Sequence, residues 1–234
     1  MRGRRSAWST LVLVGLLVGT LAVIWFADVT LKQKTSAMSA LPAPVTVATT
    51  PADPASAPPL PTAVFIGDGY TAGTDGSGWS DIVAQEMGWQ EVNLSVPGMG
   101  YRRVPETCPE KPCTAFGGLL DKAVAASPTV VVVMGGAADG DMGSAAVDTF
   151  YADLRGALPD ATIYAVGPAV SDANPPAWVA RTATNVEKAA TANGATFVDI
   201  GQPLSGKKAL VNGPGEPTVA GSRAIAEAFL AGLA

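Results

Sequence analysis

The chain has 234 residues, 48% of them hydrophobic and 15% charged, so it can form one domain with a buried core plus attached segments. It contains no histidine, which excludes a Ser-His-Asp hydrolase mechanism. Five of the fifteen basic residues but only one of the twenty acidic residues lie within positions 1–34, so the remainder has a formal charge of −9. Because that charge repels phosphate backbones, we expect no nucleic-acid partner.

The first predicted element is a membrane-spanning helix over residues 7–27. This run is uncharged and rich in Leu, Val, Gly and Ala, and at about 1.5 Å per residue it just crosses a bilayer. Three arginines precede it, which predicts that residues 1–6 stay cytoplasmic and the remainder lies outside. A cleaved signal peptide is the alternative. We favour an uncleaved signal anchor, because the run is long and no small-residue cleavage site follows closely.

Residues 28–61 are predicted to be a linker. From Thr35 onward the composition shifts to Ala, Pro, Thr and Ser, with seven prolines between Pro42 and Pro61. Such a segment cannot bury a core, and it is expected to be a semi-extended spacer. It would separate the membrane from a folded domain at residues 62–234.

The pattern of that domain is short apolar runs alternating with helical stretches. Strands are expected at 63–66, 91–96, 129–134, 162–166 and 196–200, and helices at 79–87, 116–126, 144–158, 174–192 and 217–233. The fourth of these helices is expected to begin with Asn174 as its cap and proline in its first turn. Strands separated by helices predict an α/β fold with three α/β/α layers around a parallel, flavodoxin-like five-stranded sheet.

Two cysteines, Cys108 and Cys113, stand in the sequence Cys-Pro-Glu-Lys-Pro-Cys. In an oxidising compartment this spacing favours a local disulfide over two free thiols. Two thiolates without histidine are too few ligands for zinc. The pair Asp139-Gly140-Asp141 lacks the further acidic ligands of a calcium loop. We therefore expect no metal and no cofactor.

Four loops at strand ends carry the remaining motifs. They lie at the carboxyl ends of strands or before the last helix, where ligands bind on parallel sheets. Their sequences are Gly-Asp-Gly-Tyr-Thr-Ala-Gly (67–73), Asn-Leu-Ser-Val-Pro-Gly-Met-Gly-Tyr (93–101), Gly-Gly-Ala-Ala-Asp (135–139) and Gly-Pro-Gly-Glu-Pro-Thr-Val-Ala-Gly (213–221).

In order and position these loops resemble the blocks of the SGNH (GDSL-like) hydrolase family, over essentially residues 62–234. The resemblance implies the three-layer fold and an ancestry in ester hydrolysis. The resemblance also indicates which positions of this chain correspond to the family's catalytic residues. Gly69 stands where the family has its nucleophilic serine, and Ala138 where it has the oxyanion-binding asparagine. Gly213 replaces the orienting aspartate and Glu216 the histidine base, while Gly98 keeps the oxyanion-hole glycine.

The residues that match the family are those expected to shape its turns. Around the pocket we expect Asp68, Tyr70, Thr71 and Asp139. A glycine offers no atom for an acyl-enzyme, so covalent catalysis at position 69 is excluded. The leading hypothesis is a pseudoenzyme that serves as a binding or scaffolding module at the cell envelope, with a cell-wall glycan or an envelope protein as partner.

The alternative is a hydrolase with altered chemistry, an esterase or glycan-acting enzyme with Glu216 as general base. Paired carboxylates, here with Asp68 or Asp139 nearby, serve glycoside cleavage. The simpler interpretation makes Glu216 a solvated acid that caps the last helix. Trp79, Trp89 and Trp178 could stack on a sugar, although aromatic residues at such positions more often belong to the core.

Overall fold

The computed structural model describes residues 58–73, 78–213 and 215–234. The predicted membrane helix at 7–27 and most of the predicted linker lie outside these residues. No helix within the described part is both long and apolar enough to span a membrane. The predicted spans of the five strands and five helices can be compared directly with the structure.

Five parallel strands form the sheet, in the order β2-β1-β3-β4-β5. Their bounds are β1 Thr62–Gly67, β2 Gln90–Asn93, β3 Val130–Met134, β4 Thr162–Val166 and β5 Thr196–Val198. The helical elements are α2 Gly69–Ala72, α3 Trp79–Met87, η1 Phe116–Leu119, α4 Leu120–Ala125, α5 Ala145–Ala157, α6 Ala177–Ala192, η2 Lys208–Leu210 and α7 Val219–Gly232. Two short antiparallel strands, β6 Val211–Gly213 and β7 Glu216–Pro217, form a second sheet.

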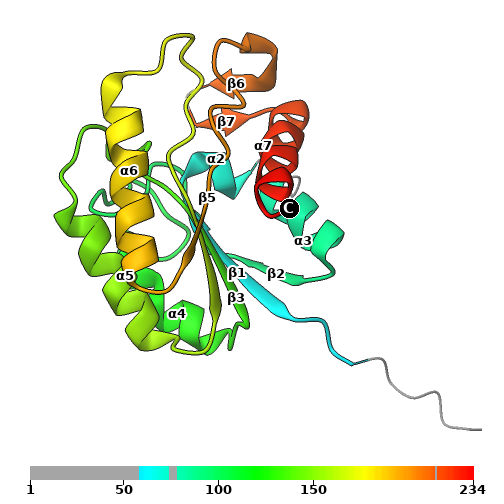
Figure 1. The fold of residues 1–234 in the computed structure, drawn as a ribbon, viewed down its shortest axis with the longest axis vertical. Coiled ribbons are helices and arrows are strands. Elements are labelled where there is room, and N and C mark those ends of the chain that lie inside the picture. The colour runs from blue at the N-terminus through cyan, green and yellow to red at the C-terminus, as the bar shows by residue number, and fades with distance from the viewer. Residues whose placement is uncertain (1–57, 74–77, 214) are drawn as a thin grey trace, which may run out of the picture. The chain divides into compact units, whose positions relative to one another are not determined.

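Helices cover both faces of the sheet, as Figure 1 shows, with α4, α5 and α6 on one side and α3 and α7 on the other. Alternate side chains of each strand point to opposite faces. In β1, Val64 and Ile66 pack in the core under α5 and α6, whereas Ala63 and Phe65 pack in the core under α3 and α7. The predicted three-layer α/β/α fold with a five-stranded parallel sheet is therefore confirmed.

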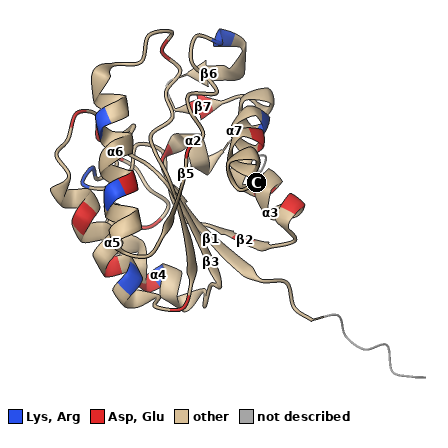
Figure 2. Cartoon of the chain, in the orientation of Figure 1, with Lys and Arg blue, Asp and Glu red and all other residues tan. Residues whose placement is uncertain are grey.

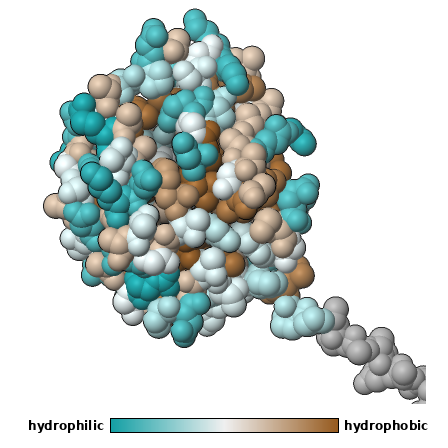
Figure 3. Space-filling model, in the orientation of Figure 1, coloured by the Kyte–Doolittle hydropathy of each residue, from teal (hydrophilic) through white to brown (hydrophobic). Residues whose placement is uncertain are grey.

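Charged and apolar residues gather on different parts of the face seen in Figures 2 and 3. Figure 2 shows acidic and basic residues interspersed along α5 and α6. Figure 3 shows apolar residues gathered in the middle of the same view, over β5 and between α6 and α7. The strand β5 pairs only with β4, so it is one edge of the sheet.

Several predicted boundaries were wrong. The helix predicted at 174–192 begins at Ala177, and its cap is Pro176 rather than Asn174. Both Asn174 and Pro175 precede a proline, which disfavours helical backbone at these two positions. The helix predicted at 116–126 begins as the 3₁₀ helix η1. The second and fifth strands end earlier than predicted, at Asn93 and Val198.

The terminal helix α7 begins at Val219 and is capped by Thr218, whose side chain accepts a hydrogen bond from the Gly221 N–H at 3.2 Å. The interpretation of Glu216 as the acid capping this helix is therefore wrong. Glu216 lies in β7, a strand that the sequence analysis did not anticipate. The predicted disulfide between Cys108 and Cys113 is present.

Candidate functional site

A cavity of about 370 Å³ lies where the carboxyl ends of β1, β3 and β4 meet the hairpin of β6 and β7. We call it the central cavity. Figure 1 shows α2 and β7 side by side at this place, below the loop that leads to α6. Its lining consists of Asp68, Gly69, Tyr70, Pro97, Gly98, Ala137, Ala138, Val170, Ser171, Asp172, Trp178, Gly215 and Glu216.

Most of the positions selected from the sequence meet in this cavity. Gly69, Gly98, Ala138 and Glu216 all line it, and so do Asp68 and Tyr70. Gly213 is not part of the lining, but it adjoins Glu216, because a Cβ added at Gly213 would lie 3.5 Å from Glu216 Oε2. The five family-equivalent positions, which span nearly 150 residues of sequence, therefore lie around one cavity.

The space beside Gly69 is already occupied by backbone. Gly69 is buried and begins α2, directly after the cap residue Asp68. A Cβ added at Gly69 would lie 2.5 Å from the carbonyl oxygen of Gly215, which belongs to the β6–β7 hairpin. Real Cβ atoms do not approach a backbone oxygen so closely, so any larger side chain at position 69 requires the hairpin to shift.

Asp68 is the most buried carboxyl group of the cavity, with 4% of its surface exposed. Its Oδ1 accepts a hydrogen bond from the Tyr70 N–H at 3.0 Å and caps the short helix α2. Burial raises the pKa of Asp68 to about 7, although hydrogen bonds from the backbone of Tyr70 and Ala138 oppose that rise. This carboxyl group therefore changes its charge near neutral pH.

Asp139 and Thr71, both expected at the pocket, lie outside its lining and hold the surrounding loops. The carboxylate of Asp139 accepts hydrogen bonds from the backbone N–H groups of Tyr101, Arg102 and Arg103, at 2.8, 3.0 and 2.9 Å. It lies so close to Gly100 that a Cβ there would overlap it.

Thr71 is buried, and its Oγ1 accepts a hydrogen bond from Trp79 Nε1 at 3.3 Å. The same hydroxyl lies where a Cβ on Gly67 would project, which explains the glycine at the end of β1. Thr71 and Asp139 therefore fix the backbone around the cavity instead of lining it.

The loop between β4 and α6 contributes residues that the sequence analysis did not select. Val170, Ser171 and Asp172 line one side of the cavity, and Trp178 lines it from the first turn of α6. Of the other two tryptophans that were considered for sugar stacking, Trp79 is fully buried and Trp89 stacks on Tyr164 with ring centroids 6.3 Å apart. Trp178 alone of the three is thus placed to meet a ligand here.

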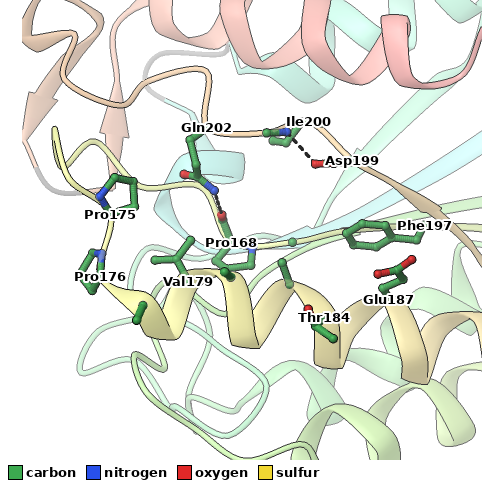
Figure 4. A pocket seen from close by; sticks show the side chains of 15 residues that line it. Pro168, Pro175, Pro176, Val179, Thr184, Glu187, Phe197, Asp199, Ile200 and Gln202 are labelled. Atoms are coloured by element: carbon green, nitrogen blue, oxygen red, sulfur yellow. Dashed lines mark hydrogen bonds between the residues drawn. The ribbon is translucent and has the colours of Figure 1, made fainter.

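A second cavity of about 400 Å³ lies at the carboxyl ends of β4 and β5, next to α6. Figure 4 shows Pro175 and Pro176 at one end of it, Phe197, Glu187 and Asp199 at the other, and Val179 between them. The amide of Gln202 donates a hydrogen bond to the Pro168 carbonyl at 2.8 Å and closes one wall. None of the positions selected from the family resemblance contributes to this second cavity.

The described residues contain no group of three or more potential metal ligands. Asp139 and Asp141, which were considered as part of a calcium loop, form other contacts in the structure. Asp139 accepts the three backbone hydrogen bonds given above, and Asp141 forms an exposed ion pair with Arg181 at 2.8 Å.

Residues 65–224 match the GDSL-like lipase/acylhydrolase family, and the chain belongs to that family. No curated protein sequence matches the chain. Among solved structures, a family two carbohydrate esterase from Clostridium thermocellum in complex with cellohexaose is similar at 16% identity and a TM-score of 0.56. That match covers 74% of this chain and 63% of the esterase, so this chain spans less than two thirds of that protein.

Two further structures are similar in fold. The structure of TesA matches with a TM-score of 0.57 at 17% identity, covering 74% of this chain and 97% of the other. A catalytic mutant of the acetylxylan esterase Axe2 from Geobacillus stearothermophilus matches with a TM-score of 0.50 at 21% identity, covering 74% and 94%. At these identities the likeness establishes a common fold and nothing finer.

Proposed function

We propose that the domain is a binding module without hydrolase activity, which uses the central cavity to hold a ligand at the cell envelope. One observation carries this proposal. Position 69, where the family resemblance puts the attacking serine, is a glycine, and the carbonyl oxygen of Gly215 lies 2.5 Å from where a side chain would begin. On this proposal the chain lacks the nucleophile, and backbone occupies the space where its side chain would begin.

The chemistry of acyl transfer explains why these changes matter. Removing the nucleophile or the base of a triad costs on the order of 10⁶ in kcat. That factor corresponds to about 8 kcal/mol of transition-state stabilisation. In this chain the residues at the nucleophile, base, orienting-acid and oxyanion-amide positions are Gly69, Glu216, Gly213 and Ala138. We expect ordinary ester hydrolysis to be lost.

Ligand binding is the role that such a domain can keep. The cavity of about 370 Å³ falls within the range of about 300–1,000 Å³ that ligand pockets have. Trp178 adds an aromatic surface of the kind that packs against sugar rings. Carbohydrate esterases are among the proteins of similar fold, and one of them was solved with cellohexaose. A cell-wall glycan is therefore the favoured ligand, and an envelope protein is the other candidate.

The location outside the membrane belongs to the same proposal. Residues 7–27 would form the anchor, with residues 1–6 in the cytoplasm and the linker at 28–61 as the spacer. The disulfide between Cys108 and Cys113 supports this location, because disulfides persist in oxidising compartments. Protease protection in membrane vesicles tests it, since the domain should be cleaved only when its side of the membrane is accessible.

The lack of activity is tested with the purified full chain in detergent. We expect no hydrolysis of p-nitrophenyl acetate above the buffer rate and no labelling by a fluorophosphonate probe. An acetylxylan esterase run in parallel shows that both assays work. A covalent adduct within residues 67–73 of this chain would overturn the proposal.

The alternative function, a hydrolase with Glu216 as general base, is favoured by the position of that carboxylate on the cavity wall. It predicts turnover of an esterified or glycosidic substrate that Glu216→Gln abolishes. The matched control is Glu187→Gln, which alters an exposed glutamate of the second cavity. Turnover that is lost in the first variant and kept in the second would establish the enzyme and refute the binding module.

A further inference from the structure

The central cavity has an unbalanced set of charged groups. Three carboxyl groups line it, and they come from three different segments: Asp68 from the end of β1, Asp172 from the loop before α6, and Glu216 from β7. No lysine or arginine is among the lining residues. Because the exposed carboxylates of Asp172 and Glu216 come from different segments of the lining, a ligand inside the cavity meets negative charge from both segments.

These acids are not neutralised by neighbouring cations of the described part. The ion pairs between side chains there join Lys122 with Glu110 and Arg181 with Asp141, and neither belongs to this cavity. Asp172 and Glu216 are exposed, so their carboxylates are hydrated and open to a ligand, whereas Asp68 is buried at the base of α2. A phosphate or carboxylate entering the cavity would be repelled by this charge.

The remaining lining suits a ring that carries a cation. Trp178 supplies aromatic surface, Ser171 supplies a hydroxyl group, and Val170 and Pro97 supply apolar contact. An ammonium group near an indole face is attracted by the ring as well as by the carboxylates. The volume of about 370 Å³ is near the lower end for ligand pockets, which favours one small ring-sized group over a long acyl chain.

We propose that the central cavity selects a sugar with a free, protonated amino group over N-acylated and acidic sugars. This inference rests on the proposed function, because it names the ligand class of the same cavity. The amine would lie among Asp172, Glu216 and Trp178, and the ring hydroxyl groups would donate to the carboxylates. An N-acetyl group removes the charge that this arrangement recognises, and a uronic acid reverses it.

The test compares three oligosaccharides of equal length with the full chain in detergent, by isothermal titration calorimetry at low ionic strength. The oligosaccharides are trimers of glucosamine, N-acetylglucosamine and galacturonic acid. We expect the glucosamine trimer to bind at least tenfold more tightly than the N-acetylated trimer, and the acidic trimer not to bind. We expect the double variant Asp172→Asn, Glu216→Gln to lose that preference.

The control carries the same change of charge elsewhere: Asp199→Asn with Glu187→Gln in the second cavity should leave the preference unchanged. Equal binding of the glucosamine and N-acetylglucosamine trimers, no binding of glucosamine trimer, or a preference that survives the Asp172 and Glu216 changes would each overturn the inference. None of these three results bears on the proposed lack of catalysis, which the ester and fluorophosphonate assays test separately. If the glucosamine and N-acetylglucosamine trimers bind equally and Trp178→Ala weakens both, the cavity still binds sugars and only the selectivity for amines is refuted.

Discussion

Two groups of residues around the central cavity differ in how they are held. The first, which we call the framework, consists of Gly67, Asp68, Thr71 and Asp139. Each of its three polar side chains accepts hydrogen bonds from backbone or indole N–H groups. The second, the rim, consists of Gly69, Ala138, Gly213 and Glu216, which offer either no polar side chain or an exposed one.

The difference separates two demands on such a site. Framework residues hold the loops, so replacing them costs stability whether or not the protein catalyses a reaction. Rim positions hold reactive groups in an active enzyme and contribute little to folding, so they can change once catalysis is not required. The predictions below test whether the framework and the rim really differ in this way.

The largest expected effect concerns the pH dependence of stability through Asp68. Its pKa is about 7 in the folded protein and near 3.8 in an unfolded chain. Between these values the folded state holds a proton that the unfolded state has released, so the free energy of unfolding falls as pH rises from about 4 to 7. The loss is at most about 4 kcal/mol, since each pKa unit is worth about 1.4 kcal/mol.

Urea titrations of the wild type and of Asp68→Asn at pH 4, 5.5, 7 and 8.5 measure this slope. The substitution should remove most of the decline, so the variant gains stability relative to the wild type as pH rises. The control is Asp172, an exposed residue of the cavity lining, and Asp172→Asn should keep the wild-type slope. If Asp68→Asn also keeps it, the proton is held elsewhere.

The next effect concerns Asp139. Its carboxylate accepts hydrogen bonds from three successive backbone N–H groups, at residues 101–103. Asp139→Ala leaves these donors without their partner and should lower the free energy of unfolding by about 2–4 kcal/mol in urea titrations. Asp141→Ala removes only an exposed ion pair and should cost less than about 1 kcal/mol. Equal losses in the two variants would contradict the assignment of Asp139 to the framework.

Much of this arrangement could be predicted from the sequence, because strong local patterns determine it. Four successive valines in β3 favour a strand buried on both faces, and the alternation with helices predicts the parallel sheet. The carboxyl ends of parallel strands lie at the same side of the sheet. That arrangement alone predicts that Gly69, Gly98 and Ala138 lie near one another, as they do in the cavity lining. What the sequence could not predict depends on tertiary contacts.

The β6–β7 hairpin is the clearest case. Its strands have three and two residues, too short to give an alternating pattern, yet it brings Gly215 onto Gly69. The role of Asp139 was missed for a similar reason, because its partners lie 36 to 38 residues away in the sequence. The position of Trp178 in the cavity had one local signal, its place in the first turn of a helix that follows a strand end.

A smaller effect is expected at Gly69, a rim position next to the framework. Gly69→Ser must displace the Gly215 carbonyl or distort α2, and it should cost about 1–3 kcal/mol of unfolding free energy. It should also remain unlabelled by a fluorophosphonate, because no imidazole is present to deprotonate the hydroxyl group. Gly143→Ser is the control, since a Cβ there meets nothing within 4 Å. A Gly69→Ser protein as stable as the wild type would show that the β6–β7 hairpin can shift without a cost in stability.

The smallest effect concerns the two rim positions 213 and 216, which the family resemblance makes an acid–base pair. A Cβ at Gly213 would lie 3.5 Å from Glu216 Oε2, so side chains at these positions should still meet. Because the chain has no histidine, Glu216→His introduces a single imidazole whose pKa is readable by NMR without overlap. Adding Gly213→Asp should raise that pKa by about one unit, because a nearby carboxylate favours the imidazolium.

The matched control for that pair is Gly213→Asn in the Glu216→His background, which has nearly the same shape without the charge. It should leave the pKa of the imidazole within a few tenths of the single variant. If the aspartate and the asparagine give the same pKa, the two positions do not meet and the backbone does not present an acid and a base to each other. If only the aspartate raises it, the backbone still presents an acid and a base to each other. Because the framework holds that backbone, the geometry of an acid–base pair would then depend on the framework and not on which residues stand at the rim.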